Sequence, residues 1–241
     1  IVDLEDAVAP KDKSAARDAA ARDLPHAGAV IVRVNSADSA WFEEDLKLCA
    51  DIGVRGIVLP KTEYPEQVRH VIDRVKPGTP ILPLIETPRG YANIAVLSES
   101  AQVQRLVFGT IDFQLAMGIN GEDDELLYFR SGLVLASRVA GIQPPVDGVS
   151  VEIDNTARVR EDALRGKRLG FGAKLCIHPK QVAPVAEVFR PTGEEISWAH
   201  RIVAAAQAAN GAAVAVDGKM VDRPVILKAE EILREAARYS A

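Results

Sequence analysis

The sequence contains little cysteine, and its cysteines follow no recognisable pattern. Cys49 and Cys176 are the only two among 241 residues, and neither belongs to a CxxC pair or to a Cys/His spacing that binds zinc. Small disulfide-stabilised proteins carry many cysteines, and structural zinc sites need ligands at short, regular spacings. The composition therefore argues against a disulfide framework and against a structural zinc site.

The sequence also lacks a basic run, a signal peptide and a long apolar segment. Its 29 Lys and Arg residues are spread along the chain and are outnumbered by 34 Asp and Glu residues, for a formal net charge of −5. Because nucleic-acid-binding surfaces are basic, we expect no nucleic acid partner. No apolar run approaches the ~18 residues that suggest a membrane-spanning helix. We therefore expect a cytoplasmic protein with no membrane partner.

A series of short, continuous apolar runs is present instead. β-branched residues dominate most of these runs, and polar residues do not alternate with the apolar ones. Such runs are typical of parallel strands that are covered on both faces. The predicted strands lie at residues 1–4, 29–34, 56–60, 81–85, 105–109, 146–153 and 173–177.

Segments rich in helix-forming residues separate these runs. One helix is expected between most neighbouring strands, and the longest gap holds "GINGEDDELLYFR", which we interpret as an inserted loop. Ser39, as an N-cap, and Pro65 mark the expected starts of two helices, and Gly53 marks an expected helix end. The predicted helices lie at residues 11–24, 39–53, 64–78, 126–141 and 158–172.

Seven strand–helix units in series favour a (β/α)8 TIM barrel, with a doubly wound parallel sheet as the alternative. A barrel of this class needs eight units, so we expect the missing unit to precede Ile1 and the chain to start at the second strand. Residues 1–190 would form this barrel domain. Residues 191–241, with two more helical segments around a turn-rich one, would form an extension that packs on the barrel or on a neighbouring subunit.

Polar side chains follow almost every predicted strand. Active sites of parallel barrels lie where the carboxyl ends of the strands meet, so these side chains would share one rim. For any single residue, contact with solvent at a strand end is an equally simple explanation. The residues at these positions are Glu5, Asp6, Arg33, Asn35, Lys61, Glu86, Asp112, Glu152 and His178.

Two of these carboxylates follow strongly apolar stretches. Glu86 comes directly after "PLI", and Asp112 lies within "RLVFGTIDFQLAMG". A carboxylate in apolar surroundings is costly unless a cation or hydrogen bonds compensate its charge. Without clustered His or Cys, the pair suggests Mg²⁺, which binds one or two carboxylates and keeps its remaining positions for water and substrate oxygens. Salt bridges to Arg89 or Arg105 are the structural alternative.

Arg33 lies within an apolar run, just before Asn35. Its guanidinium would hold a substrate carboxylate through paired hydrogen bonds. The alternative is an internal ion pair with Glu5 or Asp6, and both arrangements can coexist.

Seven motifs in order carry a family resemblance: "DLEDAVAPKDKSAAR", "VRVN", "LPKTE", "LIETPRG", "FGTIDF", "CIHPKQV" and "GKMVDRP". Together they resemble the citrate lyase β-subunit family within the HpcH/HpaI aldolase superfamily, from Ile1 to about Glu230. The resemblance implies a Mg²⁺-dependent carbon–carbon lyase in a modified TIM barrel that assembles into trimers or hexamers.

The resemblance also implies roles for individual residues. Glu86 and Asp112 would bind Mg²⁺ and, through it, the substrate. Arg33 would hold the carboxylate of a 2-oxo acid, while Glu5 and Asp6 would orient Arg33 and metal-bound waters.

One catalytic group would come from the C-terminal extension. Asp222 of "GKMVDRP" resembles an acid/base that related lyases supply from an adjacent subunit, and a turn-forming Asp is the alternative. Lys13 and Arg17, one helical turn apart, could contact coenzyme A phosphates, although a solvated helix face would look the same. His178 is expected to have a structural role.

The implied reaction cleaves a β-hydroxyacyl thioester into a 2-oxo acid and an acetyl thioester. The thioester would be of the malyl-, citramalyl- or citryl-CoA type. The alternatives are the β-subunit of a citrate lyase complex acting on an acyl-carrier protein, a malate synthase- or thioesterase-like enzyme, and a non-catalytic barrel. The residues alone do not identify the substituent on the reacting carbon.

Overall fold

The computed structural model describes residues 1–24, 29–208 and 214–239. The chain forms two compact units, Ile1–Gln181 and Val182–Ala241, which divide within helix α9 (Pro179–Phe189). The domain boundary expected at residue 190 stays a prediction.

The first unit is built on a seven-stranded sheet. All neighbouring strands are parallel, and their order in the sheet is their order in the chain. Each predicted apolar run contains one strand, so the alternating strand–helix prediction is confirmed. The strands are β1 (Val2–Asp3), β2 (Ile31–Arg33), β3 (Gly56–Leu59), β4 (Ile81–Ile85), β5 (Val107–Phe108), β6 (Val146–Asp147) and β7 (Ala173–Lys174).

This sheet is curled rather than flat. Neighbouring strands lie about 4.8 Å apart, so β2 and β7 of a flat sheet would be too distant to share side-chain contacts. Arg33 of β2 and Leu175, directly after β7, nevertheless line one cavity. The strands between them contribute to one interior cluster, which includes Ile31, Val58, Leu84, Val107, Val146 and Ala173. The curl is that of a partial barrel. Eight-stranded closure is not seen in the described residues.

Successive side chains of each strand point alternately to the interior of the curled sheet and to a second core on its other face. In β3, Val58 faces the interior cluster, whereas Ile57 and Leu59 belong to a larger cluster that packs against the helices. The same division places Leu84 inside the curl and Ile85 in the helix layer. Both faces of the sheet are therefore covered, which explains the continuous apolar runs.

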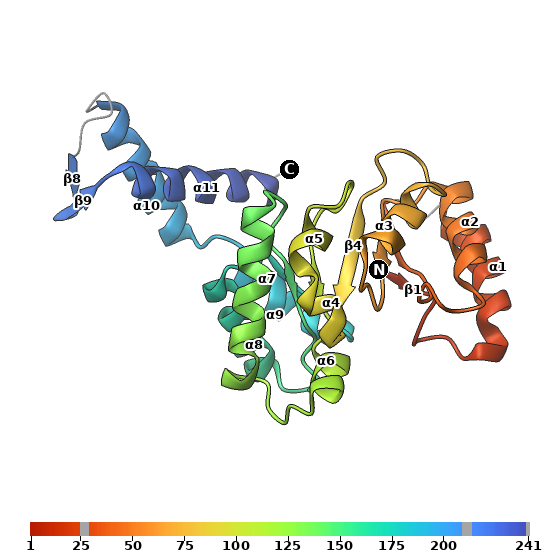
Figure 1. The fold of residues 1–241 in the computed structure, drawn as a ribbon. Coiled ribbons are helices and arrows are strands. Elements are labelled where there is room, and N and C mark those ends of the chain that lie inside the picture. Colours follow the sequence, from red (N-terminus) through yellow and green to blue (C-terminus); the bar gives the residue numbers. More distant parts are fainter. Residues whose placement is uncertain (25–28, 209–213, 240–241) are drawn as a thin grey trace. The chain divides into compact units, whose positions relative to one another are not determined.

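The predicted helices of this unit are present (Figure 1). Gly53 ends one of them in the left-handed conformation with φ of 70°, and Pro65 begins another. Trp41, rather than the predicted Ser39, is the N-cap of the second helix. The helices are α1 (Lys13–Asp23), α2 (Phe42–Ile52), α3 (Pro65–Ile72), α7 (Leu127–Val139) and α8 (Thr156–Leu169).

Three short helices were not predicted: α4 (Pro88–Ala92), α5 (Ile94–Ser98) and α6 (Thr110–Met117). α4 begins after Thr87, whose Oγ1 accepts a hydrogen bond from the backbone N–H of Gly90 at 3.0 Å. α6 is apolar around most of its circumference and shows no helical periodicity. Two 3₁₀ turns, η1 (Pro10–Asp12) and η3 (Asp124–Leu126), complete the unit, and η3 lies in the predicted inserted loop.

The second unit contains α10 (Gly193–Ala208), a hairpin of β8 (Val214–Val216) and β9 (Lys219–Val221), and α11 (Arg223–Tyr239). The hairpin turns at Asp217 and Gly218, both with positive φ, as two-residue hairpin turns require. Ala199, Ile202, Val221 and Ala229 form its buried core. Among the described residues of the whole chain, no helix has the length and apolar character needed to cross a membrane.

Candidate functional site

A cavity of about 240 Å³ lies within the first unit, at the carboxyl ends of its strands. Four residues predicted from the sequence line it together: Asp6, Arg33, Glu86 and Asp112. Its other lining residues are mostly apolar or small, namely Leu84, Phe108, Gly109, Thr110, Ile111, Val149 and Leu175. The prediction that polar residues after parallel strands share one rim is therefore confirmed for these four residues.

Arg33 is surrounded by carboxylates from β1 and from the segment after it. Its Nε and Nη2 donate to the two oxygens of Asp3 at 2.8 and 2.6 Å. Its Nη1 lies 3.2 Å from Glu5 Oε2 and 3.3 Å from Asp6 Oδ2. The internal ion pair considered from the sequence is thus present, but Asp3, to which the sequence assigned no role, is the main partner.

The local structure explains why the chain places three acidic residues so close together. Asp3 and Arg33 are paired in the parallel register of β1 and β2. Asp3 also accepts hydrogen bonds from the backbone N–H groups of Glu5 and Ala7, at 2.9 and 3.1 Å, which holds the turn after β1. Burial alone would raise the pKa of Asp3, but the hydrogen bond from Arg33 and these backbone donors lower it overall. Asp3 is therefore an ionised anchor for Arg33.

Glu86 is the most buried carboxylate lining the cavity. It is 4% exposed, and its Oε1 accepts a hydrogen bond from the backbone N–H of Lys61 at 2.8 Å. Burial raises the pKa of Glu86 to about 8, against the lowering effect of this hydrogen bond, and the charges of Glu5 and Asp112 add to the increase. A cation bound here would restore its ionised form.

Lys61 is a functional candidate to which the sequence assigned no role. Its φ of 47° lies in the left-handed region, which is uncommon for a residue with a side chain. In this conformation the backbone N–H donates to Glu86, while the ammonium lies 3.4 Å from Glu5 Oε1. The available signal was the position of Lys61 two residues after the end of β3.

Gly109 explains how Asp112 comes close to Glu86. A Cβ atom at Gly109 would lie 2.5 Å from Glu86 Cβ and 2.7 Å from Glu86 Oε2, so a larger residue would displace the carboxylate. α6 begins directly after this glycine and carries Asp112 in its first turn, with an exposed side chain. A carboxylate is electrostatically favoured at this end of a helix.

The donor atoms of this cavity suit a hard cation. Glu86 and Asp112 supply carboxylate oxygens, and no nitrogen or sulfur ligand lines the described cavity. Glu5 Oε2 is buried and accepts no hydrogen bond, and its one described polar contact is the ion pair with Arg33 Nη1 at 3.2 Å. In the part of the chain that the structure describes, no three His, Cys, Asp or Glu side chains form a complete metal cage. Two carboxylates with room for water and substrate fit Mg²⁺ better than a fully protein-coordinated ion.

The environment of Lys13 does not favour the predicted contact with coenzyme A phosphates, which stays a prediction. Lys13 is 5% exposed, and its ammonium donates to the backbone oxygens of Leu4 and Glu5 and to Asn35 Oδ1 at 2.6–2.7 Å. These three hydrogen bonds use all three N–H donors of the Lys13 ammonium, which thereby holds the segment after β1 in place. Arg17 is paired with Glu44 and Asp45, and we assign neither residue to the coenzyme.

Asp222 lies in the second unit, directly before α11. Its backbone oxygen accepts from the N–H of Ile226, and its Oδ1 accepts from the N–H of Val225 at 3.3 Å. This is the helix-capping geometry expected of the turn-forming alternative. The acid/base role stays a prediction. His178 accepts from the backbone N–H of Lys180 at 3.2 Å, which is a local structural contact.

A second charged cluster lies behind β6 and β7 and was not predicted. The carboxylate of Asp147, fully buried, accepts from Arg130 Nε at 3.0 Å and from the N–H of Gly148 at 2.9 Å. Lys174 Nζ donates to the oxygen of Gly148 at 2.6 Å. These contacts fix the segment that carries Val149 into the cavity wall.

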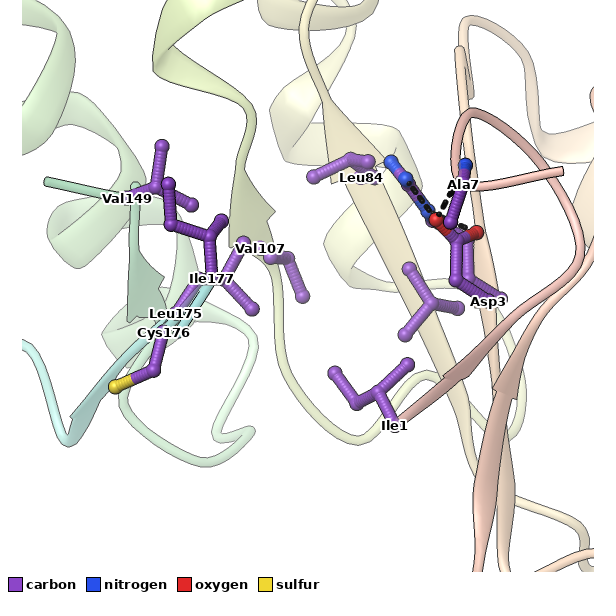
Figure 2. A pocket seen from close by; sticks show the side chains of 11 residues that line it. Ile1, Asp3, Ala7, Leu84, Val107, Val149, Leu175, Cys176 and Ile177 are labelled. Carbon is purple, nitrogen blue, oxygen red and sulfur yellow. Dashed lines mark hydrogen bonds and ion pairs between the residues drawn. The ribbon is translucent and has the colours of Figure 1, made fainter. Parts of the chain in front are cut away.

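The candidate cavity adjoins the interior of the curled sheet. A second cavity of about 400 Å³ shares Arg33, Leu84, Val149 and Leu175 with it. Figure 2 shows Val107, Val149 and Leu175 to one side of this space and Asp3 and Ala7 to the other. The site therefore has one charged side and one apolar side.

Comparisons with known proteins identify the family of the chain. A family model described as HpcH/HpaI aldolase/citrate lyase matches residues 1–179. The citrate lyase subunit beta-like protein of Deinococcus radiodurans is 37% identical over 255 residues, covering 98% of this chain and 88% of the relative. The mitochondrial citramalyl-CoA lyase of Homo sapiens is 30% identical, covering 95% of this chain and 76% of the relative.

Solved structures give the same result. The structure of CitE from Mycobacterium tuberculosis in complex with magnesium, acetoacetate and coenzyme A superposes with a TM-score of 0.81 and 31% identity. The match covers 98% of this chain and 88% of that one.

Proposed function

Because the chain belongs to the HpcH/HpaI aldolase/citrate lyase family, we propose that it is a Mg²⁺-dependent carbon–carbon lyase. Its substrate would be a β-hydroxyacyl thioester of coenzyme A, cleaved to a 2-oxo acid and acetyl-CoA. The convergence of Glu86, Asp112 and Arg33 on one small cavity carries this proposal. The human relative's name and the ligands of the Mycobacterium tuberculosis structure support it.

Glu86 and Asp112 would hold the cation. A bound Mg²⁺ would act as a Lewis acid toward the carboxylate and hydroxyl oxygens of the substrate. The hydrogen bond from Lys61 to Glu86 Oε1 keeps one carboxylate oxygen occupied and fixes the direction of the other. Gly109 keeps the space beside that second oxygen free of side-chain atoms.

Arg33 would bind the carboxylate of the 2-oxo acid. Its short pair with Asp3 holds the guanidinium in place, and its Nη1, with the longer contacts to Glu5 and Asp6, is the group that a substrate carboxylate would engage. A fixed guanidinium holds the scissile bond in one orientation, which lowers the entropic part of the barrier. Glu5 and Asp6 would orient Arg33 and accept hydrogen bonds from waters in the cavity.

The proposal includes parts that lie beyond the described cavity. Asp222 of a neighbouring subunit would exchange the hydroxyl proton as an acid/base, so we expect a homo-oligomer, as a trimer or hexamer. We further propose a closed (β/α)8 barrel, which the curl of the sheet and its sequential parallel order support. A cytoplasmic location completes this proposal.

A β-subunit of a citrate lyase complex is the second candidate. The name of the Deinococcus radiodurans relative favours it. Such a protein would act on a citryl acyl-carrier protein, and its activity would depend on partner subunits.

The test is an assay of malyl-CoA, citramalyl-CoA and citryl-CoA cleavage with Mg²⁺ and with EDTA, following 2-oxo acid and acetyl-CoA. We expect Mg²⁺-dependent cleavage that Glu86→Ala and Asp112→Ala abolish and that Asp51→Ala, an exposed carboxylate of α2, leaves unchanged. Release of free CoA would indicate thioester hydrolysis after cleavage. Failure to cleave every CoA thioester, with activity on the acyl-carrier protein, would favour the complex subunit.

A further inference from the structure

The charges around the candidate cavity are unbalanced. At its rim, five carboxylates surround two cationic side chains; they are Asp3, Glu5, Asp6, Glu86 and Asp112 against Arg33 and Lys61. A divalent cation would remove most of this excess but would not reverse it. The rim can therefore accept one additional carboxylate at Arg33 and offers little attraction for a second.

The cations also have fixed positions. Among the described residues that line the cavity, Arg33 is the only cationic one. The ammonium of Lys61 lies at Glu5 Oε1, 3.4 Å away, and Lys61 does not line the cavity. A second substrate carboxylate would thus find no second cationic side chain among the described lining residues.

One wall of the cavity is apolar. Leu84, Val149 and Leu175 come from β4 and from the segments after β6 and β7, and all three also face the interior of the sheet. A group attached to the reacting carbon and held inside the cavity would lie against these side chains. A charged group there would lose its hydration without a compensating partner.

This wall is held rigidly. Asp147 accepts a hydrogen bond from the backbone N–H of Gly148, and Lys174 donates one to the backbone oxygen of Gly148. Gly148 directly precedes Val149. A Cβ atom at Gly148 would lie 2.3 Å from Thr110 Oγ1, so the segment packs tightly on the start of α6. The wall cannot move aside to admit water around a charged group without breaking these contacts.

We propose that this site selects a 2-oxo acid whose substituent is hydrogen or a small apolar group, and discriminates against a second carboxylate. This inference rests on the proposed lyase function and names its substrate class: thioesters that release glyoxylate or pyruvate, rather than oxaloacetate. An unpaired charge against this wall should reduce binding by about 100-fold.

Calorimetric titration of the Mg²⁺-loaded protein with four acids tests the proposal without requiring turnover. The acids are glyoxylate, pyruvate, 2-oxobutyrate and freshly dissolved oxaloacetate. 2-Oxobutyrate is the size control, because it extends pyruvate by an uncharged methyl group. We expect pyruvate and 2-oxobutyrate to bind within about tenfold of each other and oxaloacetate to bind about 100-fold more weakly than pyruvate.

Three outcomes would overturn the proposal: oxaloacetate binding as tightly as pyruvate, equal rejection of 2-oxobutyrate and oxaloacetate, or no binding of any 2-oxo acid. Different results would contradict the proposed lyase reaction and the proposed selectivity. Selective binding without thioester cleavage would contradict the lyase assignment only, whereas efficient Mg²⁺-dependent cleavage of citryl-CoA would contradict the selectivity only.

A charge introduced into the wall gives a second test. Leu175→Arg should shift the ratio of oxaloacetate to pyruvate affinity toward oxaloacetate by at least about tenfold, because it supplies the missing cation. Leu115→Arg is the matched control, because Leu115 of α6 is 83% exposed, and it should not change the ratio. An unchanged ratio in a folded Leu175→Arg protein would contradict the role of the wall. Should that variant not fold, the wild-type titration decides.

Discussion

Two pairs of neighbouring strands carry the same arrangement of charges and use it differently. Asp3 is in register with Arg33 across β1 and β2, and Asp147 is in register with Lys174 across β6 and β7. The first pair lies at the cavity rim, whereas the second lies behind the wall, where Asp147 bonds Arg130 of α7. The face of the sheet on which a pair lies decides whether it can meet a ligand or only the helix layer.

The arginines beside the two pairs differ in exposure, because the Arg33 side chain is 22% exposed and the Arg130 side chain 4%. Arg33 keeps longer contacts to Glu5 and Asp6 that a ligand could replace. Arg130 is 3% exposed and bonds both Asp147 and the oxygen of Glu122 at 2.6 Å. The first cluster should therefore affect activity most, and the second should affect stability most.

Breaking the buried pair should have the largest effect. Arg130→Met removes the guanidinium that donates to the buried Asp147 and leaves Lys174 as its nearby cation, which should lower the free energy of unfolding by about 3–5 kcal/mol. Urea unfolding measures this change. The double variant Arg130→Met/Asp147→Leu should recover much of the loss, because it removes both charges. Arg22→Ala, from an exposed ion pair, should change the free energy of unfolding far less. Equal effects of Arg130→Met and Arg22→Ala would contradict the comparison.

Breaking the rim pair should act on turnover. Arg33→Met should reduce kcat/KM for the preferred thioester by about 100- to 1,000-fold, because the substrate carboxylate loses its charged partner. Asp3→Asn should produce a smaller decrease, since it loosens Arg33 without removing it. Steady-state kinetics measure both, with a check by circular dichroism that the variants are folded. Full activity in Arg33→Met would remove Arg33 from the site.

The left-handed conformation of Lys61 should reverse the usual order of stability of glycine and alanine variants, with a smaller change in free energy than the substitutions above. At most positions glycine destabilises relative to alanine, but at a φ of 47° it should stabilise by about 1 kcal/mol. We therefore expect Lys61→Gly to unfold at higher urea concentration than Lys61→Ala. The same two substitutions at Lys47, exposed on α2, should show the ordinary order. Lys61→Ala more stable than Lys61→Gly would contradict the assigned backbone conformation.

The pH dependence of stability should show the smallest effect. Burial lowers the pKa of Lys174 below its ordinary value of 10.5, although the charges of Asp147 and Asp162 oppose this change. Between the two values the unfolded chain binds more protons, so the free energy of unfolding should rise as the pH increases toward 10.5. Lys174→Met should lack this part of the increase. Identical pH profiles of the two proteins would contradict the lowered pKa.

The sequence predicted elements better than side-chain directions. Continuous apolar runs identified all seven strands, because strands covered on both faces are apolar throughout. The strand-end rule identified Arg33, Glu86 and Asp112 as neighbours, since parallel strands end at one rim. α6 was missed because its apolar residues show no helical period.

Residues whose role depends on burial could not be predicted. Lys13 looks like a solvated helical lysine in the sequence, but the turn after β1 folds over it and supplies its three acceptors. Asp3 could not be separated from Glu5 and Asp6, because the strand register selects the partner of Arg33. The unusual backbone of Lys61 has no signal in its residue type.

Calorimetric titration of Mg²⁺ into the wild-type protein, Glu86→Gln and Asp112→Asn tests the central claim most directly. The account predicts one binding site that either substitution weakens strongly, while the same titration of Asp51→Asn matches the wild type. Unchanged Mg²⁺ binding in both Glu86→Gln and Asp112→Asn would show that the cation, if bound, lies elsewhere, and would contradict the assignment of this cavity as the site of chemistry.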